Sequence, residues 1–154
     1  MDAFFLDSSA IVKRYVNETG SNFIETLTDV KGGNFILMAR ITRVELAAAI
    51  ARRLKGRSIT NADAQNALIA FNKDLISTYF TVEVTPAILS AAANLCTTYA
   101  LRGYDAVQLA AMLEANTERV SAGLSPLKLV SADKELNAAA QTEGLGFEDP
   151  NNHP

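Results

Sequence analysis

The chain has 154 residues, of which 49% are hydrophobic and 20% charged, so it is long enough for one domain with a sizeable core and too short for two ordinary ones. Its single cysteine, Cys96, excludes a disulfide framework, and its single histidine, His153, makes histidine-dependent catalysis a poor candidate. The net charge of −3 gives no global attraction to nucleic acid, although Lys and Arg crowd residues 40–57. With neither a membrane-spanning apolar run nor a secretory signal pattern, we expect a soluble, cytoplasmic protein.

Apolar patterning and capping signals predict strands that alternate with helices. Strands are expected over residues 3–6, 35–38, 80–84 and 127–130, with an edge strand at 145–147. Helices are expected over residues 10–16, 21–31, 42–55, 60–75, 86–101, 106–113 and 134–141. Strands separated by helices need crossover connections, which predicts an α/β fold with a mostly parallel sheet. We expect one domain over residues 1–148 and a disordered tail over residues 149–154.

Four carboxylates fall where a predicted strand has just ended or a predicted helix has just begun: Asp7, Glu45, Asp105 and Asp133. Because the carboxyl ends of parallel strands lie at one edge of a sheet, the four can converge on one acidic pocket. Carboxylates at close range repel, and a hard divalent cation such as Mg²⁺ or Mn²⁺ relieves that repulsion. Such an ion activates water and neutralises phosphate charge, so the pattern favours phosphodiester hydrolysis.

Each carboxylate also has a structural interpretation. Asp7 is a good N-cap for the helix that follows it, and Thr42 with Glu45 fits a capping box. Asp105 and Asp133 suit helix starts because they complement the helix macrodipole. These interpretations stay open for each residue taken singly, whereas the matching positions of all four favour a site.

Basic residues near the acids in sequence are candidate phosphate ligands: Lys13, Arg14, Arg43 and Arg102. Exposed lysines and arginines are more often simply solvated, so each of them also has an ordinary surface interpretation.

Four segments stand in a characteristic order: Leu-Asp-Ser-Ser-Ala at 6–10, Thr-x-x-Glu at 42–45, Arg-Gly-Tyr-Asp-Ala-x-x-Leu-Ala at 102–110 and Ser-Ala-Asp at 131–133. Together they resemble the PIN domain, and more narrowly the VapC group of PIN-domain ribonuclease toxins. The resemblance implies a three-layer α/β/α domain with a central parallel sheet. It further implies that the acids bind Mg²⁺ or Mn²⁺ and cut RNA by activating water.

Residue by residue, the resemblance assigns the family's acidic positions to Asp7, Glu45, Asp105 and Asp133, and its small polar supports to Ser8 and Ser131. It also implies an RNA substrate, an antitoxin protein that inserts a basic side chain among the acids, and a homodimer. The expected function is therefore a metal-dependent endoribonuclease that acts as the toxin of a toxin–antitoxin pair.

Two other functions compete with this one. In a phosphatase, Asp7 would act as the nucleophile, but the usual signature has a second Asp two residues on, where this chain has Ser9. The alternative from another class is a non-catalytic PIN-like module that binds RNA or a protein. The complete set of four acids argues against that module.

Overall fold

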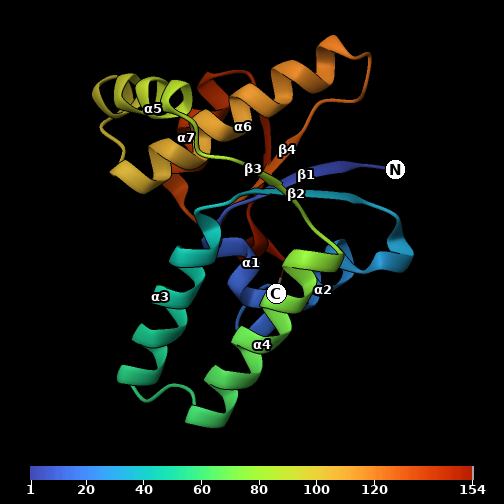
Figure 1. Cartoon of the computed structure of the whole chain (residues 1–154), viewed down its shortest axis with the longest axis vertical. Coiled ribbons are helices and arrows are strands. Elements are labelled where there is room, and N and C mark those ends of the chain that lie inside the picture. Colours follow the sequence, from blue (N-terminus) through green and yellow to red (C-terminus); the bar gives the residue numbers. More distant parts are fainter. Residues whose placement is uncertain (154) are drawn as a thin grey trace.

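The computed structural model describes residues 1–153 and shows a five-stranded sheet with helices on both faces (Figure 1). The strands are β1 (Ala3–Leu6), β2 (Phe35–Ala39), β3 (Phe80–Val82), β4 (Lys128–Val130) and β5 (Gly146–Glu148). The α-helices are α1 (Ser8–Tyr15), α2 (Ser21–Thr28), α3 (Thr42–Lys55), α4 (Asn61–Ser77), α5 (Pro86–Tyr99), α6 (Gly103–Ser121) and α7 (Lys134–Thr142). Two 3₁₀ turns are η1 (Val30–Gly32) and η2 (Pro150–Asn152). No helix within the described residues is long and apolar enough to cross a membrane.

The sheet order is β3-β2-β1-β4-β5, and every neighbouring pair is parallel. The chain starts at the centre with β1, moves outward through β2 and β3, and then returns to β4 on the other side of β1. This reversal creates a switch point between β1 and β4, where the Asp7 amide donates to the carbonyl of Val130 at 3.2 Å. Ligand sites of open α/β sheets lie outside the carboxyl ends of the strands at such a point.

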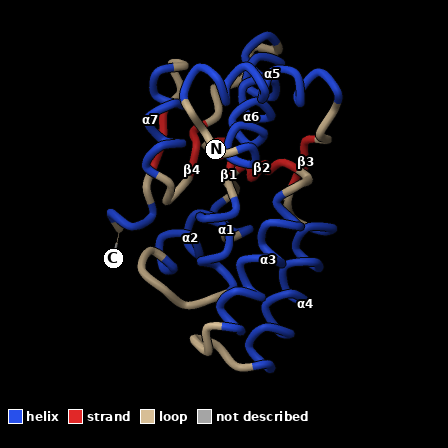
Figure 2. Tube along the Cα trace, turned by 90° about the vertical axis from the view of Figure 1, so that its left-hand side faces the viewer, coloured by secondary structure: helices blue, strands red, loops and turns tan. Residues whose placement is uncertain are grey.

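The helices form a layer on each side of the sheet, with α1 to α4 on one face and α5 to α7 on the other (Figure 2). Successive β1 side chains point to opposite faces, so Phe4 and Leu6 pack under the first layer and Phe5 packs under the second. Each face thus has its own apolar core. The predicted three-layer α/β/α fold with a parallel sheet is confirmed.

Most predicted elements are present, and the main differences lie at helix ends. The helix expected to reach residue 31 ends at Thr28, because the Asp29 side chain accepts from the Lys31 amide and starts the separate turn η1. Helix α6 begins at Gly103, three residues before the expected start, and continues to Ser121. The earlier start places Asp105 in the first turn of α6.

The C-terminal residues 149–153 pack against the body of the fold, which differs from the disordered tail expected for residues 149–154. Pro150 is buried, and the Asn151 side chain accepts a hydrogen bond from Nζ of Lys13 at 3.0 Å. The His153 ring stacks on Phe23 with 4.0 Å between ring centroids. Residue 154 lies outside the described residues.

Candidate active site

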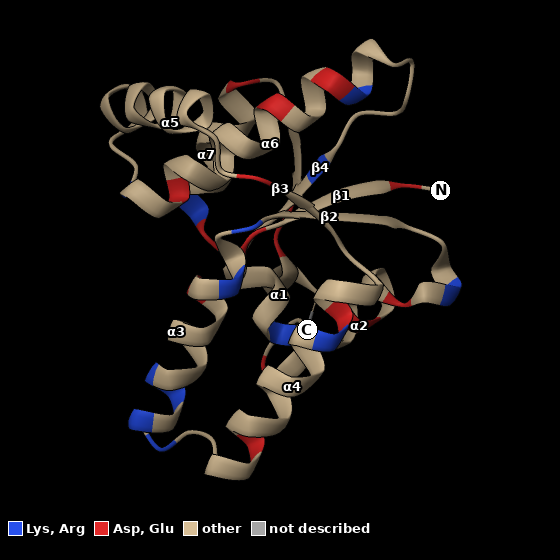
Figure 3. Cartoon of the chain, in the orientation of Figure 1, with Lys and Arg blue, Asp and Glu red and all other residues tan. Residues whose placement is uncertain are grey.

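The four predicted acids line one pocket of about 480 Å³ at the carboxyl edge of the sheet. Asp7 directly follows β1, Glu45 lies in the first turn of α3, Asp105 lies in the first turn of α6, and Asp133 is the N-cap of α7. Figure 3 shows acidic segments from both helical layers at this edge. The switch point of the sheet therefore brings together residues that lie up to 126 positions apart, from 7 to 133.

Asp7 is buried, with 3% of its surface exposed, and three donors hold its carboxylate. Oδ1 accepts from Ser9 Oγ at 2.7 Å and from the Ala10 amide at 3.1 Å, while Oδ2 accepts from Ser131 Oγ at 3.0 Å. Burial raises the pKa of Asp7 to about 7, against the lowering effect of the hydroxyl donors. The bond to Ala10 makes Asp7 the N-cap of α1, so the same carboxylate caps a helix and lines the pocket.

Glu45 is held by two side chains from other helices, and it does not form the capping box that its spacing from Thr42 allowed. Helix α3 has Ile41 as its N-cap, with no side-chain cap bond. Ser8 Oγ donates to Oε2 of Glu45 at 3.2 Å, and Nε2 of Gln108 donates to Oε1 at 2.6 Å. These bonds direct the carboxylate of Glu45 toward α1 and α6, and away from its own helix start.

Asp105 and Asp133 share one guanidinium, that of Arg102. Nε of Arg102 lies 3.4 Å from Asp105 Oδ2, and its terminal NH2 lies 3.2 Å from Asp133 Oδ2. Burial raises the pKa of Asp105, repulsion from Asp133 raises it further, and Arg102 lowers it. Asp133 also accepts from the Leu136 amide at 2.9 Å, so it caps α7 as well as lining the pocket. Arg102 thus supplies the positive charge between these two acids.

Two polar residues that sequence reasoning missed support the acids. Ser9 donates to Asp7 and accepts from the Ala132 amide at 2.9 Å, so it links the ends of β1 and β4. Gln108 is buried on α6 and donates to Thr42 Oγ1 at 2.9 Å as well as to Glu45. Two features of the sequence could have pointed to these residues: Ser9 is the second hydroxyl residue of the Asp-Ser-Ser run, and Gln108 is an amide on an otherwise apolar helix face. Of the two predicted supports, Ser8 contacts Glu45 and Ser131 contacts Asp7.

Two basic residues predicted to contact phosphate do not lie in the pocket. Lys13 is 6% exposed, and its ammonium donates to Glu18 at 3.3 Å and to the Thr19 carbonyl at 2.9 Å. It lies about 9 Å along the helix axis from Asp7, at the opposite end of α1. Arg43 is exposed and is not among the α3 residues that line the pocket.

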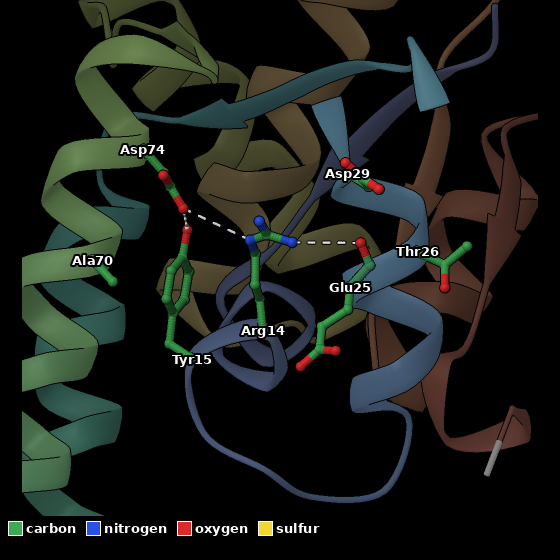
Figure 4. A pocket seen from close by; sticks show the side chains of 7 residues that line it. All are labelled: Arg14, Tyr15, Glu25, Thr26, Asp29, Ala70 and Asp74. Atoms are coloured by element: carbon green, nitrogen blue, oxygen red, sulfur yellow. Dashed lines mark hydrogen bonds and ion pairs between the residues drawn. The ribbon is translucent and has the colours of Figure 1, made fainter. Parts of the chain in front are cut away.

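Arg14 belongs to a second pocket, of about 550 Å³, between α1, α2 and α4 (Figure 4). Its Nε lies 3.7 Å from Asp74 Oδ2, the same oxygen that accepts from Tyr15 Oη at 2.7 Å. Its NH1 group donates to the Glu25 carbonyl at 3.4 Å. Burial raises the pKa of Tyr15 far above its ordinary value, so this phenol stays protonated and continues to donate. Arg14 therefore ties α1 to α2 and α4, and it is remote from the four acids.

The donor set of the acid pocket fits a hard divalent cation. All four side chains offer carboxylate oxygens, the ligand type that Mg²⁺ and Mn²⁺ prefer. The contact of Arg102 with Asp105 and Asp133 shows where these acids attract positive charge. Across residues 1–153, no three Asp, Glu, His or Cys side chains are already arranged as ligands of one ion. A cation held by these acids would compete with Arg102 for Asp105 and Asp133.

A parallel sheet whose switch point gathers acids from four separate segments defines a known class of α/β domain. The family model described as PIN domain matches residues 4–141, and the chain belongs to the PIN-domain family. Two curated relatives from Mycobacterium tuberculosis, named Ribonuclease VapC45 (strain CDC 1551 / Oshkosh) and Ribonuclease VapC49 (strain ATCC 25618 / H37Rv), are each 30% identical over 144 residues. Each match covers 94% of this chain and 93% of the relative, which confirms the predicted resemblance to VapC proteins.

Solved structures share the same fold. The crystal structure of VapC20 from Mycobacterium tuberculosis, described as a toxin that cleaves the sarcin-ricin loop, has a TM-score of 0.65 and 16% identity. The match covers 88% of this chain and 94% of that one. VapBC2 from Rickettsia felis, bound to a DNA fragment from its promoter, has a TM-score of 0.63 and 15% identity, covering 97% and 98%. At these identities the likeness establishes the fold alone.

Proposed function

We propose that this protein is a metal-dependent endoribonuclease that hydrolyses phosphodiester bonds in RNA, and that it is the toxin of a toxin–antitoxin pair. The observation that carries the proposal is the convergence of four carboxylates in one pocket at the switch point of the sheet. The names of the curated relatives, Ribonuclease VapC, support RNA as the substrate.

The proposed cofactor is Mg²⁺ or Mn²⁺, and the residues that would hold it are Asp7, Glu45, Asp105 and Asp133. When bound, such an ion lowers the pKa of a water ligand and offsets the negative charge of the phosphate. Because burial leaves the pKa of Asp7 at about 7, a nearby cation also favours the ionised form that ligation needs.

The chain's own polar residues orient the acids for this task. Ser9 and Ser131 hold the two oxygens of Asp7, while Ser8 and Gln108 hold those of Glu45. Such second-layer hydrogen bonds fix the direction of carboxylate ligands and tune their affinity for metal. Arg102 has 78% of its side chain exposed, so it can leave the acids and hold a phosphate oxygen of the substrate.

The proposed protein partner is an antitoxin that covers the acid pocket with a basic side chain. The position of Arg102 between Asp105 and Asp133 supports this, because these two acids form ion pairs with a guanidinium. A solved neighbour from Mycobacterium tuberculosis, described as a member of the VapBC family of toxin–antitoxin systems, supports an antitoxin as a class of partner. The proposed homodimer rests on the resemblance to VapC proteins.

The test is cleavage of a mixed structured RNA by the purified chain with Mn²⁺, Mg²⁺ or EDTA. We expect cleavage with either metal, none with EDTA, and none by Asp7→Asn. The matched control is Asp29→Asn, which makes the same chemical change at an exposed cap of η1 far from the pocket and should cleave normally. RNA binding by the parent chain without any metal-dependent cleavage would favour the non-catalytic binding module.

A further inference from the structure

The C-terminal half of α3 and the loop after it carry a local excess of positive charge. Residues 52–57 contain four Lys or Arg and no acid, although the whole chain has a net charge of −3. Figure 3 shows these basic segments at the end of α3 that lies farthest from the sheet, and on the loop toward α4. The fold therefore places a cluster of cations at one end of α3 and on the loop after it.

Three of these cations have no structural partner. Arg53 forms an ion pair with Glu18 at 3.0 Å, so it serves the packing of α3 against α1. Arg52, Lys55 and Arg57 are exposed and form no ion pair within the described residues. We call these three residues the basic ridge.

The basic ridge starts at the wall of the acid pocket. Arg52 lines the pocket together with Glu45, because residues seven apart return to nearly the same face of a helix. Lys55 follows one turn later, so the two cations lie about 10 and 15 Å beyond Glu45 along the helix axis. Arg57 continues the series in the turn after α3. The cations thus lead away from the acids in one direction.

The exposed side of α3 carries no acid between the pocket and the end of the helix. Besides Arg52, the exposed residues between Glu45 and Lys55 are all alanines, among them Ala48 and Ala51. RNA must approach a pocket of four acids on a protein of negative net charge, and it needs local cations to do so. A row of exposed cations that follows the strand is the usual form of a single-strand binding track.

We infer that the basic ridge binds the phosphates of the RNA strand on one side of the bond that lies in the acid pocket. The inference rests on the proposed ribonuclease function and assigns a substrate-binding surface to it. The competing role for these cations is to offset the negative end of the α3 dipole. That role would change the stability of the helix, but it would not change how RNA binding depends on salt.

The test measures binding of a fluorescent single-stranded RNA in EDTA as salt is varied, with Asp7→Asn in every protein so that cleavage cannot interfere. The ridge variant carries Arg52→Gln and Lys55→Gln. The control variant carries Lys31→Gln and Lys73→Gln, two exposed lysines that also form no ion pair within residues 1–153, so both variants have the same net charge. Thermal unfolding of both establishes that each is folded.

Each lost phosphate contact lowers the slope of log affinity against log salt by about 0.7 for a single strand. We expect the ridge variant to lose about 1.4 from this slope, Arg57→Gln alone to lose about 0.7, and the control to keep the parental slope. An unchanged slope in the ridge variant, or an equal loss in the control, overturns the inference. If the chain with Asp7 intact cleaves RNA while the ridge variant keeps the parental slope, the basic ridge does not bind RNA but the proposed ribonuclease function stands. If the chain with Asp7 intact neither binds nor cleaves RNA, the proposed function fails as well.

Discussion

Replacement of Asp7 by Asn should make the protein more stable at alkaline pH, and this gain should shrink in acid. The amide keeps an oxygen for the Ala10 amide and Ser9, and its NH₂ group can donate to Ser131, so the cap of α1 is retained. What the substitution removes is a buried charge. The pKa of Asp7 is about 7 in the folded chain, against an ordinary value of 3.8.

The direction of this pH dependence follows from the proton that Asp7 keeps in the folded state. Between pH 3.8 and about 7 the folded chain holds a proton on Asp7 that the unfolded chain has released, so folding stability falls as pH rises through this window and levels off above it. One pKa unit corresponds to about 1.4 kcal/mol, so the two units from about pH 5 to about pH 7 contribute about 3 kcal/mol. The stabilising effect of Asp7→Asn should therefore be about 3 kcal/mol larger near pH 8 than near pH 5.

Denaturant unfolding in EDTA at the two pH values gives this difference directly, with Asp29→Asn as the control at an exposed cap. The control should change stability by a similar amount at both pH values. Parallel pH profiles for the parent chain and Asp7→Asn would contradict this prediction, because they would mean that the buried carboxylate does not titrate in this range.

Two further substitutions test the basic residues that flank the acids. Arg102→Gln should tighten Mn²⁺ binding by about 1.4- to five-fold, since an exposed ion pair contributes about 0.2–1 kcal/mol and the metal no longer has to displace it; weaker Mn²⁺ binding by calorimetry would contradict this. Lys13→Met should lower the free energy of unfolding by about 1–3 kcal/mol, because it removes the hydrogen bonds that the buried Lys13 ammonium donates to the Thr19 carbonyl and to Asn151, and RNA affinity should not change. A loss of RNA affinity in a folded Lys13→Met protein would return Lys13 to the substrate site.

The placement of the acids was predictable because strand ends are visible in the sequence. The apolar run before Asp7 and the one before Ser131 each end at a polar residue, and parallel pairing brings such ends to one edge. The capping interpretations were partly correct too, since Asp7 and Asp133 do cap their helices. A carboxylate at the start of a helix on this edge can both cap the helix and line the pocket, so the sequence alone could not decide between these two roles.

Partners that come from distant segments were not predictable. Gln108 reaches Glu45 across 63 positions, and no motif marks a single amide on an apolar helix. Lys13 follows Asp7 closely in sequence, yet the rise of α1 carries it to the other end of the helix and into contact with Asn151 in η2. Closeness along a helix was thus a poor guide to closeness in the site.

The sequence also did not show which face of α3 is buried. Its sequence offers two overlapping apolar faces, and the structure buries Leu46 and Ile50 while it exposes Val44 and Ala48 at the pocket wall. A helix rich in alanine has little difference in hydrophobicity between its sides, so the packing partners decide its rotation. That rotation is also what turns Arg52 toward the acids.

A Mn²⁺ titration of the purified chain decides whether the four carboxylates form one cation site. We expect saturable binding that is lost in Asp105→Asn and kept in Asp29→Asn, whose carboxylate lies outside the pocket. The absence of saturable Mn²⁺ binding by the parent chain, or binding that survives in Asp105→Asn, would contradict it and leave the acids as helix caps and ion-pair partners of Arg102.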